Sequence, residues 1–202
     1  ILIRQIISNT LIATLDEKKY FADQSLYIAI NYPTKEISLK YCTAILNSKL
    51  IGFYFRKFYS EEDALFPKIK VNELKDLPLK EATNRHQITI STLVDYLLKI
   101  NDELRQINDY VPNNHLAKLF EELVDACVYE LYFEKEVKAK EADVLTLVAE
   151  QFKPIEGLPD AKQVKMIQEG YQILRNSHNE IPQRITRQKL VEEIAIIQNS
   201  TQ

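Results

Sequence analysis

Only three glycines occur among the 202 residues of this chain, at Gly52, Gly157 and Gly170. Average proteins contain about 7 % glycine. Loops that hold phosphates or dinucleotides need several glycines, because the backbone must turn tightly and approach the ligand closely. None of the three glycines lies in such a context. We therefore expect no cofactor-binding domain in this chain.

The length of the chain fits one sizeable domain or two small ones. No apolar run approaches the roughly 20 residues of a membrane span and no signal peptide is apparent, so we expect a cytoplasmic protein with no membrane partner. The first residue is Ile1 rather than methionine, which suggests a piece cut from a longer polypeptide. Cys42 and Cys127 lie in apolar helical patterns and are expected to be buried thiols.

Charge is distributed unevenly along the chain. The net charge is −3 overall, but residues 1–80 hold 12 Lys and Arg against 9 Asp and Glu, whereas residues 81–202 hold 14 against 20. Cations can neutralise phosphates, so any contact with nucleic acid is expected in the first part.

The first 80 residues predict a small mixed unit of strands and helix. Alternating and β-rich segments predict short strands over residues 1–7, 10–15 and 25–30. Residues 37–59 are helical in pattern and apolar on nearly all sides, which is typical of a helix buried on several sides. Pro67 and Pro78 bracket a predicted short strand and turn over residues 68–77.

Residues 81–202 predict a mainly helical half, and the whole chain is thus expected to be α+β. A heptad spacing predicts a spacer helix that packs lengthwise on a second helix; its residues are Ile90, Leu93, Leu97, Ile100, Leu104 and Ile107. Asn113 or Asn114 is expected to cap the next helix, which runs to about Phe133. Further helices are predicted over 142–152, 160–176 and 186–198, with Pro182 in the polar stretch between the last two.

The residues with catalytic or metal-binding chemistry form no recognisable constellation. His86, His115 and His178 are far apart and have no partner at the spacing of a zinc site. The acidic run at 61–63 is more typical of a solvated turn than of a nuclease site, and Glu130 with Glu134 is more typical of a solvated helix face. We therefore expect no metal site and no catalytic activity in this chain.

Basic and polar residues of the first part are better candidates for binding DNA. Lys and Arg can contact phosphates or guanine, and Gln can pair with adenine. Lys68 and Lys70 alternate along the predicted strand and should share a face. The candidate DNA-binding residues are Lys18, Lys19, Gln24, Arg56, Lys57, Lys68 and Lys70.

Several segments of this part resemble the TaqI-like C-terminal specificity domain of adenine-specific DNA methyltransferases and fused type II restriction–modification enzymes. The shared order is strand, loop, helix with Asn47-Ser48-Lys49, basic strand and proline-closed loop. The segments that carry the resemblance are 3–6, 23–27, 44–50, 55–57, 66–70 and 77–79. A looser resemblance to the helical tail of the fused enzymes continues through residues 128–133.

The resemblance implies a DNA target-recognition unit at 1–80 followed by a helical spacer or tail at 81–202. Its partners would be double-stranded DNA and a separate catalytic methyltransferase domain, with or without a nuclease domain. The methyltransferase domain would bind S-adenosylmethionine and extrude the target adenine. The aromatic rings of residues 53–59 would then belong to the core, Arg56, Lys57, Lys68 and Lys70 would contact the DNA backbone, and base reading would fall to the loops at 18–25 and 60–64.

An alternative remains open on the sequence alone. The heptad residues and the acidic helices could dock a protein partner, which would make the chain an assembly module without direct DNA contact. A concentration-dependent dimer that is lost on Leu97→Asp would favour this alternative.

Overall fold

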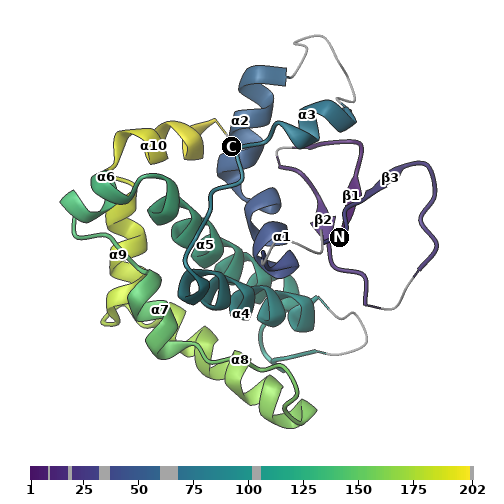
Figure 1. Ribbon diagram of the computed structural model, residues 1–202. Helices are drawn as coiled ribbons and strands as arrows, with labels where there is room; N and C mark the ends of the chain where they lie inside the picture. Colours follow the sequence, from purple (N-terminus) through teal and green to yellow (C-terminus); the bar gives the residue numbers. More distant parts are fainter. Residues whose placement is uncertain (9, 18–19, 32–36, 60–67, 102–105, 201–202) are drawn as a thin grey trace.

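The computed structural model describes residues 1–8, 10–17, 20–31, 37–59, 68–101 and 106–200. A small sheet lies on one side of the molecule, and helices form the rest (Figure 1). The sheet comes from the first 30 residues, and the part after residue 80 is helical wherever it has regular structure. The fold is therefore α+β, as predicted.

The sheet of the described region has three antiparallel strands in the order β2-β1-β3: β1 (Leu2–Arg4), β2 (Ala13–Thr14) and β3 (Leu26–Ile28). Ile3 of the central strand pairs with Ala13 on one side and Tyr27 on the other. Ile3 and Ala13 are buried, whereas Arg4 and Ile28 are exposed, because successive side chains point to opposite faces of a strand. The three predicted strands are confirmed, and each is shorter than its apolar pattern.

The predicted helix over 37–59 is two helices, α1 (Leu39–Asn47) and α2 (Lys49–Tyr59). The chain leaves the helical conformation at Ser48, whose hydroxyl donates to the carbonyl of Ile45 at 2.7 Å and accepts from the amide of Ile51 at 3.3 Å. A serine that bonds to neighbouring backbone groups offers them an alternative to helical partners. The uninterrupted apolar pattern concealed this break.

The predicted short strand and turn over 68–77 is wrong for most of its length, because a helix occupies its centre. Lys68 forms a single antiparallel bridge with Ile6, and a short helix follows as α3 (Val71–Lys75). The carboxylate of Glu73 accepts the backbone N–H of Lys70 at 2.7 Å, which satisfies one of the unpaired amides at the start of a helix. Lys68 and Lys70 are both exposed and Ile69 between them is buried.

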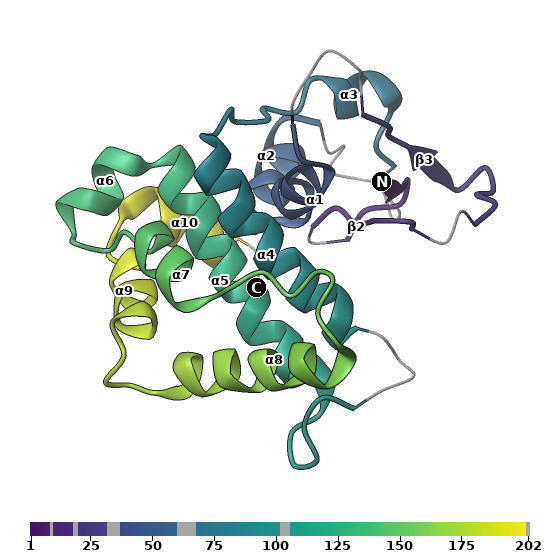
Figure 2. The ribbon, with the colours of Figure 1, turned by 60° about the horizontal axis from the view of Figure 1, so that its bottom comes forward.

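The helical half is built around α4 (Asn84–Ile100), which packs between α1 and α5 (Asn113–Tyr132). The remaining helices follow as α6 (Glu134–Ala139), α7 (Leu145–Gln151), α8 (Asp160–Arg175), α9 (Glu180–Gln188) and α10 (Glu192–Asn199). In Figure 2, α8 runs along the lower edge of the molecule and the sheet lies on the opposite side of α4.

The heptad residues that the structure describes pack in the core of the protein. Ile90, Leu93 and Ile100 are fully buried in the common core, and Leu97 packs against it. The helix ends at Ile100 rather than continuing to Ile107, which is buried from a loop; Leu104 lies outside the described residues.

Several predicted helix boundaries are wrong. Asn113 is the first residue of α5 rather than its cap, and its side chain bonds to the carbonyl of Ile100 and the amide of Ile107. The segment 186–198 is divided between α9 and α10, and Pro182 lies in the first turn of α9 rather than in a linker. Proline fits there because first-turn amides have no partner within the helix.

One hydrophobic core crosses residue 80 without interruption. Buried side chains of α1 and α2 belong to the same cluster as those of α4, α5 and α10. Three rings from the helical half, Tyr96, Phe120 and Phe152, stand within 6.2 Å of one another by their centroids. Both cysteines are free and buried, as predicted. In the described part of the chain, no helix has the length and apolar character needed to cross a membrane.

Candidate nucleic-acid interface

The Asn47-Ser48-Lys49 motif joins the sheet to the helices. The Asn47 side chain accepts the amide of Ala13 and donates to its carbonyl, both at 2.8 Å. The backbone amide of Lys49 donates to the buried carboxylate of Asp125 on α5 at 2.9 Å, and the Lys49 ammonium lies 3.5 Å from the same group. The motif therefore fixes the position of the sheet relative to the helical half.

Gln5 gathers two distant segments at the end of β1. Its backbone amide donates to the carbonyl of Ser25 at 3.0 Å, and its side-chain amide donates to the carbonyl of Gln24 at 2.7 Å. Its own carbonyl accepts the amide of Ile69 at 3.0 Å. Two of the predicted site residues, Gln24 and Lys68, are thus brought to the same edge of the unit although 44 positions separate them in the sequence.

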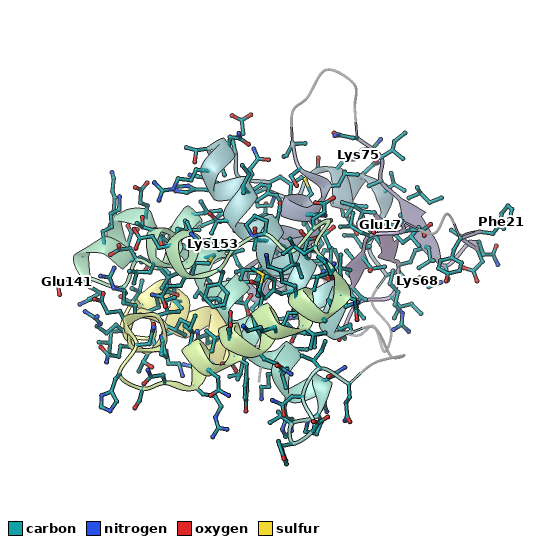
Figure 3. The ribbon with its side chains drawn as sticks, turned by 90° about the horizontal axis from the view of Figure 1, so that it is seen from below. Glu17, Phe21, Lys68, Lys75, Glu141 and Lys153 are labelled. Atoms are coloured by element: carbon teal, nitrogen blue, oxygen red, sulfur yellow. The ribbon has the colours of Figure 1, made fainter. Side chains whose placement is uncertain are left out.

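The two lysines of this edge differ in their surroundings. Ile69 between them is buried, and its carbonyl accepts the hydroxyl of Tyr27 at 3.1 Å, which holds the segment in place. Lys70 lies 3.6 Å from the carboxylate of Glu73. Lys68 is exposed and forms no ion pair within the described chain, so its charge is available to a ligand (Figure 3).

The predicted pair on α2 is placed differently. Arg56 is half-buried, and its guanidinium donates to the carbonyl of Ser200 at 3.5 Å, beyond the end of α10. Burial lowers the pKa of this guanidinium. Lys57 is exposed on the same helix. The structure therefore does not bring Arg56 into the edge at Gln5, and its assignment to DNA stays a prediction.

Lys18 and Lys19 lie outside the described residues, as does the loop at 60–64. The rings of α2 divide between two environments: Phe55 is buried as predicted, but Phe58 is largely exposed. Two exposed aromatic residues, Tyr20 and Phe21, stand in the loop between β2 and β3, within the segment 18–25 that was predicted to read bases, but Phe21 was not singled out as a candidate. An aromatic pair between polar residues was the sequence signal that could have revealed them.

Buried carboxylates of the helical half serve the fold. Glu130, predicted to lie on a solvated face, is instead buried and accepts the amides of Val144 and Leu145 at the start of α7. Burial raises its pKa. Burial also raises the pKa of Asp125 to about 6, against the opposing effect of Lys49. Each group satisfies helix N-terminal amides, which accounts for its burial.

A groove of about 630 Å³ separates the end of β2 from α4. Its central cation, Lys40, already contacts Asp95 at 2.7 Å and Glu156 at 2.9 Å. The charge of Lys40 is therefore already paired within the protein. Within the described ranges, no group of three or more His, Cys, Asp and Glu side chains could hold a metal ion.

Comparison with known proteins identifies the N-terminal unit. No curated protein and no solved structure matches the chain. The family model covers both the Asn47 motif and the edge around Gln5, Gln24 and Lys68, and so confirms the resemblance read from the sequence. Residues 1–79 match the TaqI-like C-terminal specificity domain.

Proposed function

We propose that this chain is the target-recognition module of a restriction–modification DNA methyltransferase. The observation that carries the proposal is the family match over residues 1–79. The matching family consists of non-catalytic specificity domains. The edge formed around Gln5 supports it, because an unpaired cation and an exposed amide side chain are suited to phosphate and base edges.

In this proposal the chemistry belongs to another domain. A catalytic methyltransferase domain, with or without a nuclease, binds S-adenosylmethionine and modifies adenine. The recognition unit contacts double-stranded DNA and positions that domain over its target. The helical half acts as a brace, because α4 and α5 pack directly on the helices that support the sheet.

A salt titration of duplex binding tests the proposal. The full-length protein is titrated with a 40-base-pair duplex pool whose central positions are random, and the bound fraction is sequenced. We expect enrichment of one sequence and a linear fall of log K with log salt. Lys68→Gln should lower the magnitude of that slope by about 0.9, the value for one lost phosphate contact.

Lys135→Gln is the matched control, because Lys135 is exposed on α6, far from the sheet in Figure 1. Its slope should equal that of the wild type. Equal recovery of all sequences from the pool would contradict the recognition role. An unchanged slope for Lys68→Gln beside clear enrichment would remove only this lysine from the interface.

A further inference from the structure

Phe21 is the most exposed large apolar residue of the described chain. Its relative exposure is 106 %, and that of its neighbour Tyr20 is 66 %. Among described residues, eight exposed large apolar side chains lie in residues 1–80 and four in the longer remainder. Single exposed apolar residues are common on protein surfaces. Exposed apolar side chains are thus more frequent in the smaller unit, and Phe21 is the most exposed of them.

The loop that presents Phe21 is anchored on both sides of the ring. On one side, the backbone amide of Tyr20 donates to the Asp16 carboxylate at 2.8 Å. On the other side, the Asp23 carboxylate accepts both the amide and the hydroxyl of Ser25. Ordered anchors reduce the entropy that a loop loses when it binds. Figure 3 shows the Phe21 side chain pointing away from the body of the protein.

This loop belongs to the edge described above. Gln24, three positions after Phe21, is held through its carbonyl by the side chain of Gln5, whose backbone also receives the Lys68 segment. The aromatic ring therefore projects from the same edge that carries the unpaired cation.

We propose that Phe21 inserts its ring at a base step of the bound duplex, with Lys68 on the adjacent phosphates. The inference rests on the proposed function and names the residue that makes apolar contact with the bases. Apolar side chains that enter a base step partly unstack it. Unstacking at the site would assist a partner domain that extrudes a base.

A protein partner fits this ring less well. Interface anchors of that kind lie at the centre of packed apolar patches. The residues directly after Phe21 in the loop include Asp23 and Gln24, which are polar and exposed. Phe21 and its neighbour Tyr20 are thus a short aromatic pair in an otherwise polar loop, and a small aromatic projection suits a narrow gap between bases.

Phe21→Ala tests the proposal, since a side chain with full exposure contributes little to folding. The full-length protein is titrated with a duplex of the sequence enriched from the random pool, with 2-aminopurine placed at each position in turn. We expect Phe21→Ala to weaken binding by about tenfold or more, the range of losing one base–aromatic contact, without a change in salt slope. The fluorescence rise that reports unstacking should disappear, and Phe21→Trp should restore it.

Tyr110→Ala is the matched control. Tyr110 is 94 % exposed in the segment before α5, in the helical half, and its removal should leave both signals unchanged. Wild-type binding and fluorescence in Phe21→Ala, beside a reduced salt slope in Lys68→Gln, would overturn the wedge and leave the recognition role intact. A wild-type protein that enriches no sequence would overturn both. Loss of self-association in Phe21→Ala with unchanged DNA binding would overturn the wedge in favour of a protein contact.

Discussion

The side-chain amide of Asn47 makes two hydrogen bonds of 2.8 Å with the backbone of Ala13, one to its N–H and one to its C=O. Asn47 is the last residue of α1, and Ala13 lies in β2, on the edge of the sheet. The amide thus pairs with the edge strand as a backbone neighbour would. This contact gives the asparagine of the Asn47-Ser48-Lys49 motif a structural role.

Asn47→Ala should destabilise the protein by about 2 kcal/mol, because it leaves two backbone groups of Ala13 without a partner in a part-buried position. Urea denaturation measures the free energy of unfolding. Asn114→Ala is the control, since Asn114 is exposed in the first turn of α5. Equal unfolding free energies for the two variants would show that the motif does not anchor the sheet.

The pH dependence of stability should report Asp125. Its pKa is raised from 3.8 to about 6 in the folded protein, chiefly by burial. The folded state therefore holds this proton more tightly than the unfolded state does. The resulting stabilisation is fully present below pH 3.8 and is lost as the pH rises to about 6. A shift of about two pKa units corresponds to about 3 kcal/mol.

Asp125→Asn isolates this effect, because the amide retains an acceptor for the Lys49 N–H but does not titrate. From pH 4 to pH 7, the unfolding free energy of the wild type should fall relative to that of Asp125→Asn. The control Glu121→Gln replaces an exposed carboxylate on the same helix and retains Asp125. Its unfolding free energy should therefore change with pH as that of the wild type does. A constant difference between wild type and Asp125→Asn across this range would contradict the raised pKa.

Gly170→Ala should destabilise the protein, because it disturbs the packing of α8 on its neighbours. A Cβ at this position would lie 2.9 Å from Phe152 and 3.2 Å from Phe120, two buried rings. In an exposed helix the same change should stabilise by about 1 kcal/mol, so the sign of the effect is diagnostic. We expect a loss of about 1–3 kcal/mol from overpacking, measured by thermal unfolding. Gln172→Ala on the exposed side of α8 should be nearly neutral, and a stabilised Gly170→Ala variant would show that the rings yield easily.

The sequence predicted the class of the fold and the existence of most elements because their apolar periods are strong. It missed the break at Ser48, where apolar residues continue on both sides of a serine that bonds to nearby backbone. It also placed Glu130 in solvent, because its partners at the start of α7 lie 14 and 15 positions away. Long-range pairing of this kind leaves no local pattern.

The candidate site shows the same division. Lys68 and Gln24 were selected for their chemistry, but their meeting at Gln5 depends on hydrogen bonds between segments far apart in the sequence. Arg56 was selected on equal grounds and faces the C-terminal end instead. Composition therefore identified suitable side chains, whereas only the fold decides which of them share a surface.

Leu97→Asp should destabilise the fold rather than dissociate an oligomer. Leu97 packs against the common core beside the fully buried Leu93 and Ile100. A carboxylate there would have to be buried without a partner or leave the core, at a cost of about 3 kcal/mol.

Ile88→Asp is the control on the same helix, because Ile88 is 51 % exposed. Circular dichroism should show a lowered melting temperature for Leu97→Asp alone, while light scattering gives the same mass for the wild type and Ile88→Asp. A wild-type dimer that Leu97→Asp converts to a folded monomer would instead assign the heptad residues to a partner.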